Sequence, residues 1–580
     1  MENEVKTDLQ EAMELCRTSF ATAGFFSLFI NFLMLVPALY MLQLYDRVLV
    51  SSSEATLVML TLIMVLLFIT MGSLTWARSA ILVRVSARLE TLLKVRLFGL
   101  AFKQALYSPG VGSASQPLDD LTGLRQFLTG QGLFAFFDAP WMPIYIAVMF
   151  MFHEWFGWMA IATVIVLVIL AYVQEKQTGA TLKLANSLAI DGRGLVNRNL
   201  RNAEVVESMG MLAGVRKSWV ENTSKVMALQ CGASNKSATI QALTKTIRLL
   251  SQSLVLGVGA YLVLLQEISP GLMIAGSILL GRALAPIDLM IGSWKGFISA
   301  RGQYNRLNEN LLAIPQESKK MELPSPDGEL IATEIMVGAA GGAKPILIGV
   351  SLSLAPGESL GIIGPSASGK STLARALLGI WPVLSGSVRL DGVDIFNWNK
   401  EELGPYIGYL PQDIELFEGS ISDNISRFGG VEPEKVVAAA RIADVHDMIL
   451  KLPKGYDTVI GSVSGVLSGG QRQRIGLARA VYDDPKLVLL DEPNSNLDEK
   501  GESALEHALA ILREKKTTVI VITHRPGILK VLDKLLLLKN GRLVHYGTTK
   551  EVLEQLNKTK HPKQKGKEVV SAPITIVPVT

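Results

Sequence analysis

The chain has 580 residues, 49% of them hydrophobic, and its 56 Lys and Arg against 52 Asp and Glu leave a formal charge of +4. This length predicts several domains. A charge so close to neutral excludes the strongly basic surface of many nucleic-acid-binding proteins, and we predict no nucleic-acid partner. Two cysteines, Cys16 and Cys231, are too few for a disulfide framework, so we predict two reduced structural thiols.

The first 20 residues carry a weak helical stripe of apolar side chains that includes Leu9, Ala12, Met13 and Cys16. Such a helix could lie on the membrane surface or pack loosely in the cytosol, and the sequence leaves both alternatives open. The start of the segment is acidic, and no small-residue cleavage site follows the first apolar run. We therefore expect neither a signal peptide nor a leader-peptidase domain.

Apolar residues are concentrated in roughly the first 300 positions. A helix needs about 20 apolar residues to cross the hydrocarbon core of a bilayer, and six stretches meet that length. The six predicted spans are Thr18–Tyr45, Ala55–Ala77, Gly132–Phe152, Trp155–Gln174, Leu249–Gln266 and Gly271–Gly292. The sequence therefore predicts an α-helical membrane domain.

The connections between these spans alternate in length and charge. Two long connections, Arg78–Gln131 and Glu175–Arg248, are rich in Lys and Arg, whereas the short ones contain only Arg47. By the positive-inside rule, the long connections and both termini lie in the cytoplasm. Their helical periodicity and scarcity of breakers predict that they are helical extensions of the spans.

Three charged residues, Asp138, Arg282 and Asp288, fall within the predicted spans. Charges at membrane depth are rare and are functional candidates by default. An ion pair between Asp138 and Arg282 is one interpretation. The alternative is a set of structural ion pairs or water-facing helix ends without a transport role.

A polar linker, Pro315–Gly328, leads into a region with the character of a soluble domain. There a strand-like run is followed by "GPSASGKST", which fits the phosphate-binding pattern G-x-x-x-x-G-K-[ST]. Glycines let the backbone wrap around phosphates, Lys370 supplies a positive charge, and the Ser371 hydroxyl can bind Mg²⁺. The predicted phosphate-binding residues are Gly364, Pro365, Ser366, Ala367, Ser368, Gly369, Lys370, Ser371 and Thr372.

The apolar run Leu487–Leu490 ends in two adjacent carboxylates, Asp491 and Glu492. Burying an unpaired charge is costly, so a carboxylate at the end of a buried strand needs a cation or a chemical role. A Mg²⁺ ion bound to phosphate would be a suitable cation for Asp491. Glu492 would then stand where a general base polarises the attacking water.

Three further stretches accompany these motifs: "YLPQD" with Gln412, "LSGGQ" with Ser468 and Gly470, and "VITHRP" with His524. Together, and in this order, they resemble the ATP-binding cassette (ABC) family. The resemblance implies ATP and Mg²⁺ as cofactors, with Gln412 at the Mg²⁺ and γ-phosphate and His524 positioning the attacking water beside Lys370 and Glu492. Ser468 and Gly470 would contact ATP held by a second subunit, which implies a homodimer.

The resemblance also suggests the domain organisation, an exporter-type helical membrane domain plus an α/β P-loop nucleotide-binding domain. The predicted boundaries are 1–20 for an N-terminal cytoplasmic segment, 21–312 for the membrane domain, 313–330 for a linker, 331–557 for the ABC domain and 558–580 for a basic, disordered tail. Contact of the lysine-rich tail with anionic membrane lipids is an alternative.

Further stretches, among them "GIWP", "GYLPQDIELFEGSISDNI" and "FDAPWMPIY", look like the permease/ATPases of type I secretion systems, in the protease-secretion branch called PrtD. This implies an inner-membrane ATPase that exports unfolded proteins with C-terminal signals. Its partners would be a membrane-fusion adaptor and an outer-membrane channel. An exporter of lipids or hydrophobic small molecules is the alternative, and a nucleotide-gated channel is disfavoured by the intact Glu492 and His524.

Two positions depart from the pattern of ABC exporters. The stretch Glu334–Leu347 has no aromatic residue to stack on adenine. Ser462 stands in place of the glutamate that often precedes the signature sequence. We therefore expect weaker nucleotide affinity and a different set of coupling contacts at that position.

Overall fold

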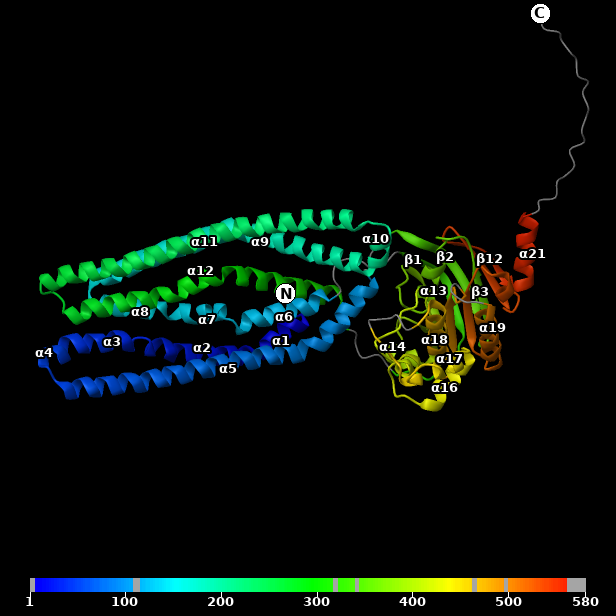
Figure 1. The fold of residues 1–580 in the computed structure, drawn as a ribbon, viewed down its shortest axis with the longest axis horizontal. Coiled ribbons are helices and arrows are strands. Elements are labelled where there is room, and N and C mark those ends of the chain that lie inside the picture. The colour runs from blue at the N-terminus through cyan, green and yellow to red at the C-terminus, as the bar shows by residue number, and fades with distance from the viewer. Residues whose placement is uncertain are drawn as a thin grey trace, which may run out of the picture. The chain divides into compact units, whose positions relative to one another are not determined.

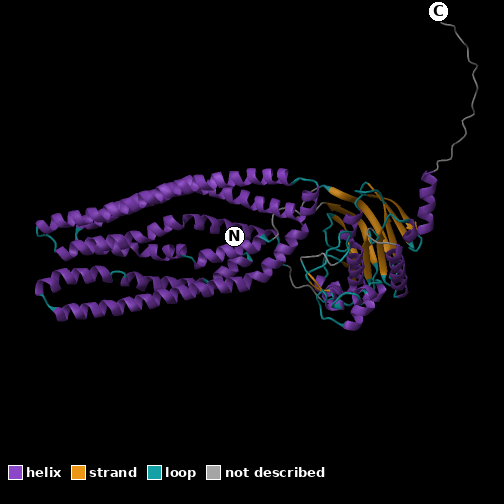
Figure 2. Ribbon diagram, in the orientation of Figure 1, coloured by secondary structure: helices purple, strands orange, loops and turns teal. Residues whose placement is uncertain are grey.

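Long helices make up the first part of the chain, and strands flanked by helices make up the second (Figure 2). The computed structural model describes residues 6–107, 115–316, 322–338, 344–461, 467–494 and 499–560. The chain folds as two compact units, Met1–Gln316 and Glu317–Thr580. Figure 1 shows the helices of the first unit running side by side along its length.

Among the described residues, six helical segments are long and apolar enough to cross a membrane, as the sequence predicts. They are Arg17–Ser51, Glu54–Tyr107, Gln131–Phe152, Glu154–Arg201, Leu212–Leu264 and Pro270–Ala313. The helices of this unit are α1 (Asp8–Leu15), α2 (Arg17–Leu33), α3 (Val36–Gln43), η1 (Leu44–Val48), α4 (Leu49–Ser51), α5 (Glu54–Tyr107), α6 (Gln116–Thr129), α7 (Gln131–Asp138), η2 (Ala139–Trp141), α8 (Met142–Phe152), α9 (Glu154–Arg201), α10 (Ala203–Ser208), α11 (Leu212–Leu264) and α12 (Pro270–Ala313).

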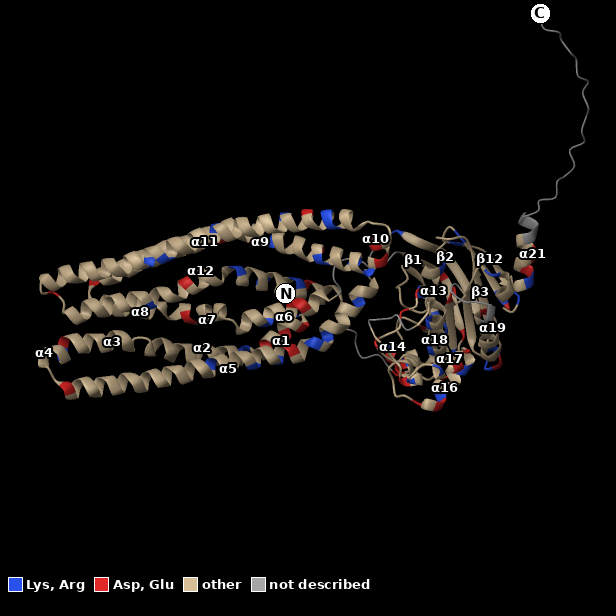
Figure 3. Cartoon of the chain, in the orientation of Figure 1, with Lys and Arg blue, Asp and Glu red and all other residues tan. Residues whose placement is uncertain are grey.

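The long connections are helical extensions of the spans, which confirms the prediction from their periodicity. Helix α5 runs unbroken for 54 residues, about 80 Å at 1.5 Å per residue. The hydrocarbon core of a bilayer is only about 30 Å thick, so most of this helix projects beyond it. Figure 3 shows that the charged residues of this unit are more frequent toward the end that carries α1, α6 and α10.

The third span is divided into two helices, α7 and α8. Between α7 and α8 lies one turn of 3₁₀ helix, η2, which contains Pro140 and is followed closely by Pro143. A proline inside a helix removes a backbone donor and clashes with the preceding turn. The two prolines therefore account for the interruption, which lies directly after Asp138.

Helix α1 packs inside the helical unit, and its apolar stripe does not cover a membrane surface. Leu9 and Cys16 are fully buried in a cluster with leucines of α5, α6 and α12. Asp8 pairs with Arg96 of α5 at 2.7 Å, and the Thr7 hydroxyl donates to the Asn308 side chain of α12 at 2.6 Å. Apolar burial and polar pairing thus place α1 against α5 and α12. The apolar stripe of α1 is therefore packed inside the unit, and it is neither free to face a membrane nor loosely packed.

The second unit contains a mainly parallel sheet, an antiparallel sheet and a short two-stranded ladder. The strand orders are β12-β11-β3-β10-β9-β6, β2-β1-β4-β5 and β7-β8. The strands are β1 (Leu330–Gly338), β2 (Pro345–Leu354), β3 (Ser359–Ile363), β4 (Ser385–Leu390), β5 (Val393–Asp394), β6 (Ile407–Leu410), β7 (Gly419–Ser420), β8 (Val459–Ile460), β9 (Leu487–Asp491), β10 (Thr518–Ile522), β11 (Lys534–Lys539) and β12 (Arg542–Thr548). The helices are α13 (Lys370–Leu377), α14 (Lys400–Leu403), η3 (Gly404–Tyr406), α15 (Ile421–Ile425), α16 (Pro433–Ile442), α17 (His446–Leu450), η4 (Gly455–Asp457), α18 (Gly469–Val481), α19 (Glu499–Glu514), α20 (Pro526–Leu529) and α21 (Thr549–Lys560).

Strands β3, β9 and β10 form the centre of the six-stranded sheet, and every residue in them is buried. Strands buried on both faces need continuous apolar sequence, as the runs "SLGII", "LVLLD" and "TVIVI" supply. Two large apolar clusters cover the two faces of this sheet. The sheet is therefore the rigid element from which the site residues project.

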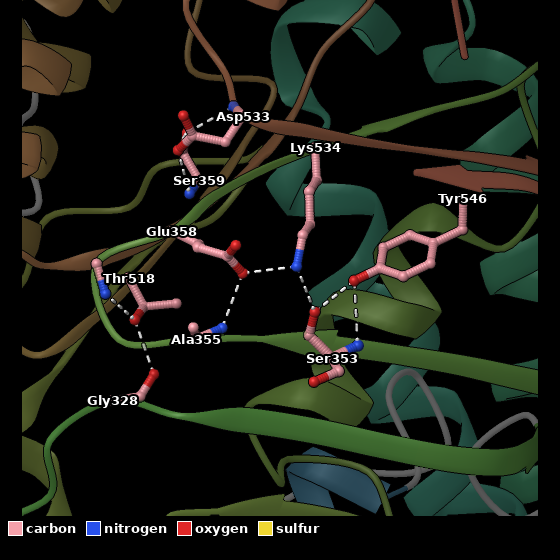
Figure 4. A network of polar contacts seen from close by, with 10 residues as sticks. Gly328, Ser353, Ala355, Glu358, Ser359, Thr518, Asp533, Lys534 and Tyr546 are labelled. Atoms are coloured by element: carbon pink, nitrogen blue, oxygen red, sulfur yellow. Dashed lines mark hydrogen bonds and ion pairs between the residues drawn. The ribbon is translucent and has the colours of Figure 1, made fainter. Parts of the chain in front are cut away.

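A polar network ties the start of β3 to its neighbours (Figure 4). The Asp533 carboxylate accepts hydrogen bonds from the Ser359 backbone N–H at 3.0 Å and from the Ser359 hydroxyl at 2.7 Å. Close by, Lys534 pairs with Glu358 at 2.7 Å. Because β3 leads directly into the phosphate-binding sequence, this network sets the position from which that sequence begins.

Replacing Asp533 with Ala is expected to lower the free energy of unfolding by about 1–3 kcal/mol, because it leaves buried donors of Ser359 without their acceptor. Thermal unfolding of the purified protein measures the effect. Glu554→Ala is the matched control, since Glu554 is exposed on α21. Equal stability of the two variants would show that the network does not hold β3.

Candidate active site

The predicted site residues come together because the central strands of the large sheet run parallel. Strands β3, β10, β9 and β6 are neighbours in parallel register, so their carboxyl ends share one edge. The phosphate-binding sequence follows β3, His524 follows β10, Asp491 and Glu492 end β9, and Gln412 follows β6. Ligands of open α/β sheets bind at this edge.

The phosphate-binding loop has the geometry that its glycines predict. A Cβ atom at Gly364 would lie 2.1 Å from the Leu538 carbonyl oxygen, and Gly369 has a φ of 99° at the start of α13. Neither position admits a side chain without strain. The Lys370 ammonium group donates to the carbonyl oxygens of Gly364 and Pro365 at 2.9 and 3.0 Å. Its charge therefore lies inside the loop, where a phosphate would lie.

Two buried polar atoms at this edge have no hydrogen-bond partner within the described parts of the chain. They are the hydroxyl oxygen of Ser368 and one carboxylate oxygen of Asp491, both in side chains that are 3% exposed. An unpaired buried polar atom is costly, which makes both atoms candidates for contact with a bound ligand. The Ser371 hydroxyl acts on the Asp491 carboxyl and lowers its pKa, and hydroxyl and carboxylate oxygens are the ligands that Mg²⁺ prefers. The residues present thus fit a magnesium ion.

Burial shapes the electrostatics of the site. It raises the pKa of the Asp491 carboxyl above its usual range, and the Ser371 hydrogen bond and the charges of Arg375 and Lys370 oppose that shift. Burial also lowers the pKa of the Lys370 ammonium, which the carboxylates of Glu492 and Asp491 oppose. Because neighbouring charges offset the burial of these two groups only in part, the Asp491 carboxylate favours an arriving cation and the Lys370 ammonium favours an arriving anion.

The adjacent carboxylates Asp491 and Glu492 serve different neighbours. Glu492 has a φ of 50°, in the left-handed region, and its backbone N–H donates to the Ile522 carbonyl at 2.9 Å. Its side chain accepts a hydrogen bond from Gln412 at 3.0 Å, and His524 Nε2 lies 3.7 Å from its other oxygen. Strained backbone of this kind is concentrated at active sites. The turn therefore places the Asp491 carboxylate near Ser371 and the Glu492 carboxylate near Gln412 and His524.

Ser468 and Gly470 are not among the residues that bond to one another around Glu492. Ser468 caps α18, in a reciprocal hydrogen-bonding arrangement with Gln471, and Gly470 lies in the first turn of that helix. Over the ranges that the structure describes, no hydrogen bond or ion pair joins Ser468 to the phosphate-binding loop. Ser462, residues 495–498 and part of the stretch expected to hold adenine lie outside the described residues.

Sequence reasoning missed Arg375, five positions after Lys370. Its guanidinium lies over the Trp381 ring, 4.8 Å from the centroid, and acts electrostatically on Tyr409 of β6 and on Asp491. No local signal identifies it, because a spacing of five residues places the two side chains about 140° apart around a helix. A pattern based on phosphate binding alone does not include it.

The structure corrects the predicted partners of the charges within the spans. Asp138 pairs with Arg78 of α5 at 2.7 Å, not with Arg282. Asp288 pairs with Arg248 of α11 at 2.5 Å. Arg282 is exposed, and in the described part of the chain it has no ion-pair partner. Arg78 is the first residue after an uncharged span, so it reaches the depth of Asp138 on the neighbouring helix.

Comparison with known proteins identifies the chain. A family model described as the ABC transporter transmembrane region matches residues 20–284, and one described as ABC transporter matches residues 347–495. The type I secretion system ATP-binding protein PrsD of Rhizobium meliloti is 42% identical over 550 residues, which cover 95% of this chain and 94% of that protein. The chain belongs to the ABC transporter family, in its type I secretion branch. This exporter therefore binds ATP and couples its hydrolysis to protein secretion.

Two further comparisons agree with this assignment. The alpha-hemolysin translocation ATP-binding protein HlyB of Escherichia coli O157:H7 is 30% identical, covering 91% of this exporter and 76% of that protein. The solved structure of a bacterial Atm1-family ABC exporter with ATP bound superimposes with a TM-score of 0.78 at 22% identity, covering 96% of this chain and 100% of that chain. The second likeness shows the exporter fold alone.

Replacing Lys370 with Ala is expected to weaken ATP binding by roughly 10- to 100-fold, because charge-assisted hydrogen bonds contribute about 1.5–3 kcal/mol each. Titration of the purified exporter with a fluorescent ATP analogue measures the affinity. Lys530→Ala, an exposed lysine after α20, is the control and should bind normally. Unchanged affinity in Lys370→Ala would contradict the placement of the phosphates.

Proposed function

We propose that Glu492 is the general base of ATP hydrolysis in this exporter. The observation that carries the proposal is its position, bonded to Gln412 and 3.7 Å from His524, next to the buried carboxylate of Asp491. Glu492 would accept a proton from the attacking water, and His524 would orient that water and the γ-phosphate. Lys370 and the backbone N–H groups of the loop would hold the phosphates.

We further propose that Ser371, Asp491 and Gln412 hold Mg²⁺. When bound, the ion neutralises charge on the phosphate oxygens. Ser371 and Asp491 already interact electrostatically, and the amide nitrogen of Gln412 donates to Glu492, which leaves the amide oxygen available. Few protein ligands are needed, because Mg²⁺ takes its remaining ligands from phosphates and water.

We infer that the exporter works as a homodimer with two composite ATP sites. Each chain supplies one phosphate-binding loop and one signature sequence, and among the described residues no hydrogen bond joins Ser468 to the loop of its own chain. Ser468 and Gly470, at the N-terminus of α18, would meet the ATP of the second copy, where helix N–H groups favour an anion. Isologous contact between two copies completes both sites at once.

We propose that the cargo is an unfolded protein with a C-terminal secretion signal. The membrane would be the inner membrane, with both termini in the cytoplasm, and a fusion protein and outer-membrane channel would complete the route. The names of relatives support this cargo class, since they describe secretion of cyclolysin and translocation of alpha-hemolysin. They disfavour the lipid or small-molecule alternative. The accumulation of Lys and Arg in the long helical extensions supports the orientation.

The test measures the ATPase rate of the exporter reconstituted in lipid vesicles, with and without a peptide that carries a C-terminal secretion signal. We expect the signal peptide to change the rate while a scrambled peptide does not. A rate that responds to lipids or small apolar compounds and to no secretion signal would overturn the cargo assignment.

A further inference from the structure

One arginine joins the strand that precedes Gln412 to the helix that begins at the signature sequence. Arg427 lies two residues after the end of α15, and all three of its guanidinium nitrogens donate to main-chain carbonyl oxygens. The acceptors are Gly404 at 2.8 Å, Ile407 at 2.9 Å, Arg479 at 3.0 Å, Ala480 at 3.2 Å and Tyr482 at 3.3 Å. A guanidinium group has five N–H donors, so these five bonds use its full capacity.

The acceptors belong to elements that cannot supply all the donors themselves. A helix has no intrahelical donors for its last four carbonyls, and Arg479 and Ala480 lie in the last turn of α18. Ile407 begins β6, the outermost strand of the six-stranded sheet, which has a neighbouring strand on one side only. Burial lowers the pKa of the Arg427 guanidinium to about 10, so it keeps its charge at neutral pH, and positive charge is favoured at a helix C-terminus.

Strand β6 and helix α18 also meet backbone to backbone. A Cβ atom at Gly408 of β6 would lie 2.1 Å from the Ala480 carbonyl oxygen, so a side chain there would push the helix away. Arg427 and Phe428 both have a φ of 58°, in the left-handed region that favours glycine. Such strain persists only where the surrounding structure fixes it, and the five hydrogen bonds supply that constraint.

Both elements lead directly to residues of the ATP site. Gln412 follows β6 by two residues and donates to Glu492 at 3.0 Å. Helix α18 has Ser468 at its N-cap and is 13 residues long, so it extends about 20 Å from the end that Arg427 holds. A small tilt at that end therefore becomes a larger displacement of the signature sequence.

We propose that Arg427 is a positioning residue for ATP hydrolysis, which fixes α18 against β6 and so places Ser468 and Gly470 relative to Gln412. The proposal rests on the composite ATP sites proposed above, in which Gln412 serves the ATP of its own chain and the signature sequence serves that of the second copy. The strand, the arginine and the helix then connect the two ATP sites of the dimer. None of the five hydrogen bonds goes to the phosphate-binding loop, so loss of Arg427 should lower turnover and leave ATP affinity unchanged.

The experiment compares ATP binding and turnover of the full-length exporter in lipid nanodiscs. Arg427→Met keeps an extended side chain but removes every donor, and we expect kcat to fall about tenfold or more, since a misplacement of about 1 Å can cost up to about 100-fold. Its affinity for a fluorescent ATP analogue should stay within about twofold. Arg427→Lys keeps the charge and some of the hydrogen bonds and should recover part of the rate. Arg441→Met, at an exposed position of α16, is the matched control and should behave as the wild type.

Two further variants separate positioning from stability. Gly408→Ala keeps every donor of Arg427 but wedges β6 and α18 apart, so it should lower kcat in the same way. Val388→Ala removes buried apolar volume in the antiparallel sheet and should lower the Tm, with a normal kcat at temperatures where the protein is folded. If Arg427→Met does not fold, Arg427→Lys and Gly408→Ala still decide the question.

A kcat of Arg427→Met equal to that of Val388→Ala would overturn the proposal, and so would a loss of ATP affinity as large as the loss of kcat. Ser468→Asp tests the composite sites separately, because it keeps an N-cap residue but brings a negative charge to the phosphates of the second copy. Slow turnover in Ser468→Asp with normal turnover in Arg427→Met would remove the positioning role alone. Normal turnover in Ser468→Asp would remove the composite sites and, with them, the role of Arg427.

Discussion

Glu492→Gln is expected to abolish ATP turnover by this exporter, with a loss of at least 100-fold, while ATP still binds. Glutamine keeps the size of the side chain and a hydrogen bond to Gln412, but it cannot accept the proton of the attacking water. General-base catalysis typically contributes about 10²- to 10⁴-fold. Phosphate release in lipid vesicles measures turnover, and titration with a fluorescent ATP analogue measures binding.

Glu506→Gln makes the same chemical change at an exposed position of α19 and should turn over ATP normally. His524→Ala supplies the second comparison, because we expect it to slow hydrolysis through poor positioning of the water. If Glu492→Gln kept more than a tenth of the normal rate and His524→Ala lost all of it, the base would be His524. The assignment of Glu492 would then be wrong.

Arg78→Met is expected to be among the most damaging single substitutions in the helical unit. Arg78 and Asp138 are 5% and 13% exposed in their side chains, and Arg78 also donates to Ser27 at 2.8 Å, while Asn31 donates to Asp138 at 3.0 Å. The substitution leaves the Asp138 carboxylate buried without its cation. Removing one member of a buried pair costs about 3–5 kcal/mol.

Thermal unfolding of the purified exporter in detergent measures the loss, which should appear as a much lower Tm. The double variant Arg78→Met/Asp138→Leu removes both charges and should recover most of the stability, since buried pairs are often replaceable by apolar residues. Arg84→Met, at an exposed position of α5, is the control. A Tm for Arg78→Met equal to that of Arg84→Met would show that the pair contributes little.

The polar cluster around Arg78 connects three spans. Ser27 and Asn31 lie on α2, Arg78 on α5 and Asp138 on α7, and the Tyr145 hydroxyl of α8 donates to the Asn31 carbonyl at 2.8 Å. Hydrogen bonds between helices are favoured in a membrane, where water is absent as an alternative partner. The cluster lies next to the 3₁₀ turn between α7 and α8, where the two prolines interrupt the helix.

The sequence by itself determined the six spans, their helical extensions and the residues of the phosphate-binding loop. These features depend on local properties: uncharged length, helical periodicity and the glycines that a tight loop requires. The two carboxylates at the end of β9 were also interpretable as a pair, because a buried strand does not tolerate an unpaired charge at its end. Each of these conclusions needs only residues that are close together in the chain.

Tertiary structure alone decided which distant residues meet. The parallel order of β3, β10, β9 and β6 brings Gln412, His524 and Glu492 to one sheet edge. No local sequence pattern predicts that strand order. The same holds for Arg78 as the partner of Asp138 and for the burial of α1 against α5 and α12. The same holds for the hydrogen bond from the Gln174 amide nitrogen of α9 to the Ile291 carbonyl of α12. Contacts of this kind depend on the packing of whole helices and strands, in which many weak interactions far apart in the sequence act together.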